Sequence, residues 1–165
     1  GEYDEKESKT VNDSSMINVS YFVQAGDFLF SRANTIELVG AAVIIKQAKR
    51  KLMLSDKTLR IVFNDSINKY YVLYYLRSKK GRNEIERLST GNQESMRNIG
   101  QDRIKQIAIP YCTLDEQKKV VQEIESRLSV ADKLDETIAN NLQQAEALKQ
   151  SILKKAFEGK LSTQN

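Results

Sequence analysis

The feature that most constrains this chain is one long run of helix-forming residues, 113–159. Thr113 and Glu116 have the spacing of a capping box, in which each of the two side chains accepts a hydrogen bond from a free backbone amide of the first turn. Gly159 can take the left-handed conformation that closes a helix, and two lysines precede it where they suit the negative end of the helix dipole. No glycine or proline lies between these caps, and Pro110, the only proline, ends the preceding structure. The pattern predicts a single long helix.

Apolar residues recur along this helix with a mean spacing of 3.5 residues, the period of a coiled coil. At about 1.5 Å per residue the helix would extend about 68 Å. We therefore expect part of the apolar stripe to pair with a second helix, from another copy of the chain or from a partner. The alternative is a helix packed on its own domain along its full length. The predicted helix-pairing residues are Val121, Ile124, Leu128, Ala131, Leu134, Ile138, Leu142, Ala145, Leu148 and Ile152, with Ala156 continuing the stripe.

Composition narrows the class of protein. A length of 165 residues suits one domain plus an extension, and the mean hydropathy of −0.52 is typical of a soluble chain. No apolar run approaches the roughly 20 residues that span a bilayer, so we expect no membrane contact and a cytoplasmic protein. Cys112 is the only cysteine, which excludes an internal disulfide and fits a reducing compartment.

The chain contains no histidine, which excludes Ser-His-Asp and Cys-His catalysis and the common zinc sites. It also lacks a GxxxxGK[ST] loop, a GxGxxG fingerprint and an outstanding pair of carboxylates. The sequence therefore predicts no catalytic residues, no metal and no cofactor.

The residues before the long helix predict a small α+β domain with a mixed sheet. Alternating or apolar segments predict strands at 17–23, 28–31, 39–45, 58–63 and 107–109. Gly40 inside the third of these marks a bulge or a close approach. Helices are expected after an N-cap at Asp65 or Ser66, then over 81–88 and 101–105, with a long polar loop at 89–99 between the last two.

Charge is distributed unevenly. Residues 46–105 hold 15 basic and six acidic side chains, a net charge of +9, whereas the chain from Thr113 onward holds eight basic and nine acidic ones. Basic residues gathered in a folded domain are typical of a phosphate-binding surface. This favours a nucleic acid as the partner of the domain.

Four stretches together resemble the specificity (S) subunit of type I restriction–modification enzymes. They are GDFLFSR at 26–32; the helix at 70–78; Thr90-Gly91 through Met96-Arg97-Asn98-Ile99; and Ile109-Pro110 with LDEQ at 114–117 and LKQSILKKAFEGKL at 148–161. The resemblance covers about residues 25–161.

The resemblance implies a target-recognition domain that reads half of a split sequence in double-stranded DNA. It also implies a long helix that pairs antiparallel with its counterpart and docks the methyltransferase (M) subunits of a complex that includes a restriction (R) subunit. The chemistry would belong to those subunits, so the chain itself would be non-catalytic. We accordingly expect a recognition domain at 1–112, a spacer helix at 113–159 and a tail at 160–165.

The chain has one recognition domain and one long helix where a full subunit has two of each. It is therefore expected to be a C-terminal half, a fragment, or a half-sized subunit that dimerises. The opening segment of the family's recognition domain is not recognisable in residues 1–16. Two alternatives stay open: this part of the domain is truncated, or its sequence has diverged.

Candidate DNA contacts are chosen by chemistry, because Arg and Lys can bond guanine while Asn and Gln can bond adenine. Most of the basic members are expected to bind phosphate and so to set register. The candidates are Arg32, Asn34, Lys49, Arg50, Lys51, Lys79, Lys80, Arg82, Asn92, Gln93, Ser95, Arg97 and Asn98.

A second hypothesis is a coiled-coil scaffold whose basic head binds RNA or an acidic protein without reading sequence. A nuclease or methyltransferase is disfavoured, because a single proline cannot make an Asn-Pro-Pro-aromatic motif.

Overall fold

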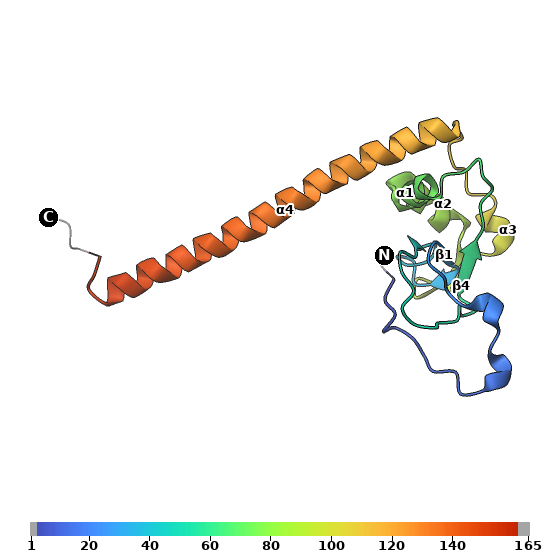
Figure 1. Ribbon diagram of the computed structural model, residues 1–165, viewed down its shortest axis with the longest axis horizontal. Helices are drawn as coiled ribbons and strands as arrows, with labels where there is room; N and C mark the ends of the chain where they lie inside the picture. The colour runs from blue at the N-terminus through green and yellow to red at the C-terminus, as the bar shows by residue number, and fades with distance from the viewer. Residues whose placement is uncertain (1–2, 162–165) are drawn as a thin grey trace. The chain divides into compact units, whose positions relative to one another are not determined.

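The computed structural model describes residues 3–161, which fall into two compact units divided after Val121 (Figure 1). The first unit is α+β, as predicted. Its elements in chain order are η1 Ser14–Met16, η2 Val19–Tyr21, β1 Phe28–Ser31, β2 Ala33–Asn34, β3 Ala42–Ile44, β4 Thr58–Ile61, α1 Lys69–Arg77, α2 Lys79–Leu88, β5 Thr90–Gln93, β6 Met96–Asn98, α3 Gln101–Ile104 and the start of α4 Leu114–Phe157.

Strand β1 is the centre of the larger sheet, which has the order β3-β1-β4. Alternation along β1 divides the core in two. Phe28 and Phe30 belong to the main cluster with buried residues of α1 and α2, whereas Leu29 joins a second cluster with Val23 and Ile45. Figure 1 shows α1 and α2 together on one side of β1 and β4.

Gly40 lies at a close approach between the turn before β3 and helix α2. Its φ is +74°, and a Cβ there would lie 2.4 Å from Cγ2 of Ile85, a residue that is completely buried. The prediction of a close approach is confirmed. The strand predicted over 39–45 is shorter, because this turn occupies its first residues and pairing begins at Ala42.

Several predicted elements are wrong. Residues 17–23 form a 3-10 turn and one isolated bridge, Phe22 to Met53, in place of a strand. Residues 107–109 form no strand; Ile107 and Ile109 pack half-buried against the core without backbone pairing. All strand pairings in the described part are antiparallel, so the sheet is not mixed. The N-cap of α1 is Asn68, whose side chain accepts from the Tyr70 amide, in place of Asp65 or Ser66.

The caps of α4 are confirmed. The Thr113 amide donates to the Glu116 carboxylate at 2.9 Å, and the Glu116 amide donates to the Thr113 hydroxyl at 3.4 Å. The Thr113 hydroxyl and amide hold the pKa of the Glu116 carboxyl below its usual range. At the far end Gly159 has φ +69°, and the Lys160 amide donates to the Lys155 carbonyl at 2.8 Å, the pattern of a Schellman motif.

The first two turns of α4 belong to the first unit, where Gln117 is only 1% exposed. Its Nε2 donates to the carbonyls of Ser66 at 3.2 Å and Cys112 at 2.9 Å, and its Oε1 accepts from the Asn68 amide at 2.8 Å. One side chain thus satisfies three backbone groups at the start of α1 and α4, which attaches both helices to one point.

The second unit, from Gln122 on, is the rest of α4, and its apolar stripe is exposed within the described chain. Leu134, Ile138, Leu142 and Leu148 are 58%, 62%, 64% and 62% exposed. Val121, by contrast, is buried in the first unit. The described helices include none with the length and apolarity to cross a membrane. Of the expected tail, residues 162–165 lie outside the described residues.

Replacing Gln117 by Glu tests the hydrogen-bonded junction. The new carboxylate would face two carbonyl oxygens, so we expect the free energy of unfolding at neutral pH to fall by about 2–4 kcal/mol. Burial raises the pKa of this carboxyl when folded, so stability recovers as pH falls through that raised pKa. Urea titrations at neutral and acidic pH measure both effects. The exposed change Gln122→Glu is the control and should lose less than about 0.5 kcal/mol; an equal loss in both variants would contradict the role of Gln117.

Candidate nucleic-acid interface

A second, polar sheet brings together candidates from two distant parts of the sequence. Its order is β2-β6-β5, and β2 pairs with β6 so that Ala33 faces Asn98 and Asn34 faces Arg97. The β5–β6 hairpin occupies most of the segment that was predicted to be a loop. The sheet and its turns therefore collect seven of the candidates, which are Arg32, Asn34, Asn92, Gln93, Ser95, Arg97 and Asn98.

The hairpin is exposed along its length. All four residues of β5 are exposed, and Met96 on β6 is 73% exposed. Gly91 is required at its base: its φ is +132°, and a Cβ there would lie 2.2 Å from the Met96 carbonyl oxygen. Near the tip, the Ile36 amide donates to the Glu94 carbonyl at 2.7 Å, which joins the loop after β2 to the hairpin.

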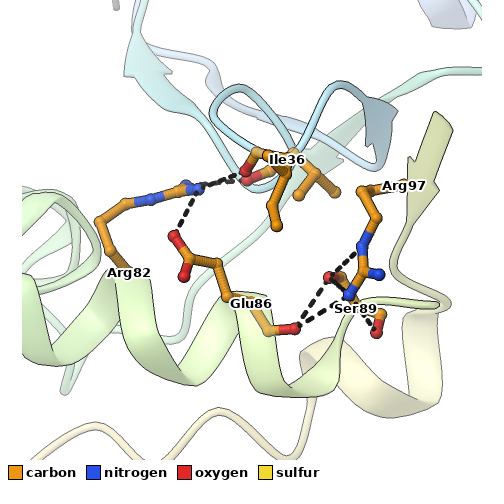
Figure 2. Close-up of polar contacts among 6 residues, drawn as sticks. Ile36, Arg82, Glu86, Ser89 and Arg97 are labelled. Carbon is orange, nitrogen blue, oxygen red and sulfur yellow. Dashed lines mark hydrogen bonds and ion pairs between the residues drawn. The ribbon is translucent and has the colours of Figure 1, made fainter. Parts of the chain in front are cut away.

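Arg97 anchors the hairpin to the C-terminal end of α2. Its Nη1 donates to the Gly91 carbonyl at 2.8 Å, and its Nη2 donates to the hydroxyl and carbonyl of Ser89 at 2.9 and 3.2 Å. Nε also donates to the Ser89 hydroxyl, and Nη2 reaches the Glu86 carbonyl at 3.4 Å (Figure 2). A cation at carbonyls that end a helix is favourable. All three nitrogens of this guanidinium therefore donate to groups of the chain itself.

Arg82 makes a corresponding anchor for the loop after β2. Its two terminal nitrogens donate to the carbonyls of Val39 at 2.8 Å and Ile36 at 3.0 Å, and Nη2 lies 3.9 Å from a Glu86 carboxylate oxygen. Figure 2 shows the Arg82 guanidinium at the Ile36 carbonyl and the Glu86 carboxylate, and Arg97 reaching to Ser89 and to the Glu86 carbonyl near the end of α2. Both arginines are predicted DNA contacts; in the structure Arg82 links α2 to the loop after β2, and Arg97 links α2 to the polar sheet.

Arg32 lies at the edge of this sheet and lines a depression of about 370 Å³ with Thr90, Asn98 and Arg103. Its backbone amide donates to the Lys57 carbonyl and its carbonyl accepts from the Ile99 amide. Its Nε is buried with no hydrogen-bond partner among the described residues. Arg103 in turn donates to the Leu88 carbonyl at 3.1 Å.

The remaining candidates lie outside the polar sheet. Lys79 and Lys80 are exposed at the first turn of α2, about 15 Å along the helix from the end that Arg97 contacts. Lys49, Arg50 and Lys51 form an exposed basic segment between β3 and β4. That segment is joined to the N-terminal segment through Glu5, whose carboxylate accepts from the Lys49 amide and whose carbonyl accepts from Arg50.

The sequence analysis missed residues that border the polar sheet. It assigns Ser89 to a loop, yet this side chain is 6% exposed and its hydroxyl accepts a hydrogen bond from Arg97. Glu37 lies in the loop after β2, where the Thr35 hydroxyl and its own amide hold the pKa of its carboxyl below the usual range. Leu38 is 49% exposed on the same loop. Only the glycine at position 91 could have indicated a tight hairpin in advance.

The described residues contain no cluster of three His, Cys, Asp or Glu side chains that could hold a metal ion. The polar sheet instead offers side-chain amides on its three strands, with the Glu94 carboxylate and the Ser95 hydroxyl in the turn of its hairpin. Such groups bind partners by hydrogen bonding.

The family model for the type I restriction modification DNA specificity domain matches residues 5–147. The specificity subunit of the type I restriction enzyme EcoEI from Escherichia coli is 33% identical over 136 residues, which are 81% of this chain and 23% of that protein. The EcoKI specificity subunit from E. coli K12 is 30% identical over 86% of this chain and 31% of its own length. A putative MjaX specificity subunit from Methanocaldococcus jannaschii is 32% identical over 83% of this chain and 31% of its own length.

The matched part of the chain thus corresponds to between 23% and 31% of the length of these relatives. The matched region includes both sheets, all of α1 to α3 and the larger part of α4. This chain belongs to the family of type I restriction modification DNA specificity domains.

Proposed function

We propose that this chain is a non-catalytic DNA-recognition component of a type I restriction–modification complex. The observation that carries the proposal is the family match, which covers the globular unit and continues through most of α4. The basic surplus of residues 46–105 and the exposed polar sheet support it, because both suit a DNA duplex. The relatives described above are all specificity subunits, so the scaffold hypothesis, with RNA or an acidic partner, has no support.

The proposal divides the chain by task. Residues 1–112 would recognise half of a split target in double-stranded DNA, and residues 113–159 would be the spacer helix. Methyltransferase and restriction subunits would supply the chemistry, in the cytoplasm. The exposed stripe on α4 would pair with a second copy of the chain or with the other half of a longer subunit. Val121 is buried in the first unit, so this pairing surface would begin near Ile124, which is half-buried.

Selection from a library of randomised duplexes tests the recognition role. We expect the retained DNA to share a short motif, because base contacts discriminate by about 1–3 kcal/mol for each mismatched pair. Affinity for the selected duplex should also fall with salt, since phosphate contacts release counterions. Salt dependence without an enriched motif would contradict sequence reading and would restore the scaffold hypothesis.

Self-association through α4 is tested by Ile138→Glu. A carboxylate on the apolar stripe would be desolvated in a helix pair, so we expect the unmutated chain to be a dimer and this variant to be a monomer at micromolar concentration. Light scattering coupled to size exclusion measures the mass. Asn140→Glu adds the same charge about 200° around the helix and should leave the dimer intact. A monomeric unmutated chain would sink the proposal that α4 pairs with a second copy.

A further inference from the structure

The tip of the β5–β6 hairpin has a chemistry that differs from the rest of the basic domain. We propose that this hairpin is the base-reading element, with Asn92 and Gln93 contacting adenine edges in the major groove and Arg97 acting as the positioning residue. The proposal rests on the DNA-recognition role proposed above and names the element and the bases that this role uses.

The side chains at the tip suit bases better than phosphates. Residues 92–95 are Asn, Gln, Glu and Ser, without a lysine or arginine. Phosphate contacts come mainly from cations, and Glu94 would be repelled by a phosphate. Amides of Asn and Gln, in contrast, can bond N6 and N7 of adenine in pairs, and a carboxylate can accept from the amino group of cytosine.

The shape of the element also fits. A two-stranded antiparallel ribbon is one of the two structures that enter the major groove, which is about 12 Å wide. Here β5 and β6 form the ribbon, and β2 pairs with only two residues of β6, Arg97 and Asn98. Strand β5 is exposed and adds no residue to the hydrophobic core. Core packing therefore does not explain why the ribbon has this sequence.

The hairpin is held at its base by Arg97 and at its tip by one backbone hydrogen bond, while the side chains of residues 92–95 stay exposed. Arg97 makes five hydrogen bonds to the end of α2 and to Gly91, and the Ile36 amide fixes the Glu94 carbonyl. A ribbon that is ordered before it binds loses less entropy on binding. Because its charge is used internally, Arg97 contributes to DNA binding through the position of Asn92 and Gln93.

In this arrangement, different parts of the surface supply the affinity for the DNA backbone and the recognition of bases. The exposed lysines Lys79 and Lys80 lie at the other end of α2 from the hairpin anchor. The two functions can thus be separated by substitution.

The test is the double variant Asn92→Ala with Gln93→Ala, assayed by randomised-duplex selection and by competition between the selected duplex and one of scrambled sequence. We expect the enriched motif to lose its preference for adenine at one or two positions, with discrimination reduced roughly 5- to 150-fold for each bidentate contact removed. Affinity for the scrambled duplex should change less than about twofold, because no phosphate contact is removed.

Two control variants define the comparison. Gln47→Ala with Asn83→Ala removes one exposed amide of each type elsewhere on the domain and should leave the motif unchanged. Lys79→Ala with Lys80→Ala should weaken binding to both duplexes alike and keep the motif.

Arg97→Lys tests positioning, because lysine keeps the charge without the fork that contacts Ser89 and Gly91. We expect discrimination to fall while affinity for the scrambled duplex stays within about twofold. If this variant has a lower Tm but discriminates between the selected and the scrambled duplex as before, Arg97 stabilises the fold and does not position the hairpin for DNA.

The inference is overturned if the hairpin double variant, with an unchanged Tm, selects the original motif with equal strength. It is also overturned if that variant loses affinity for both duplexes, since the tip would then contact phosphate. The absence of any motif for the unmutated chain would instead contradict the proposed function itself, so the two failures are distinguishable.

Discussion

The buried amide of Gln117 is the interaction on which the arrangement of the first unit depends. It satisfies three backbone groups at 1% exposure, at the place where α1 begins and α4 leaves the preceding loop. Unsatisfied backbone groups in that position would be costly, and the glutamine amide supplies the two donors and the acceptor that they need. The same helix therefore serves the domain for two turns and then presents an apolar stripe with no partner in the described chain.

Part of the positive charge of the domain belongs to arginines that bond its own backbone, whereas several lysines remain exposed. Arg82 holds the loop after β2 and Arg97 holds the polar sheet, and Arg60 donates to the carbonyls of Ser20 and Phe22 while it pairs with Asp27. Guanidinium groups suit this use, because one planar group bonds several carbonyls at once. A count of charges from the sequence thus overstates the surface that is available to phosphate. Lys79 and Lys80 are the better candidates for that role.

Long and strongly patterned elements could be predicted from sequence. The capping box at Thr113, the closing Gly159 and the strand around Phe30 are all where their local chemistry indicated. The polar hairpin at 90–98 could not be predicted in the same way, because neither of its faces is apolar and alternation is the signal of a half-buried strand. The strand predicted at 17–23 is absent for the opposite reason. This segment has the apolar alternation of a strand, but alternation alone does not supply a neighbouring strand to pair with.

The proposed interface requires the hairpin of the polar sheet to contact DNA bases. The most direct measurement is a nuclear magnetic resonance titration of the ¹⁵N-labelled chain with its selected duplex, following the side-chain amides of asparagine and glutamine. If the hairpin reads bases, the largest shifts belong to Asn92 and Gln93, with smaller ones at Asn34 and Asn98. Shifts confined to α4 or to the 46–51 segment, with the hairpin amides unmoved, would rule out base reading by the hairpin.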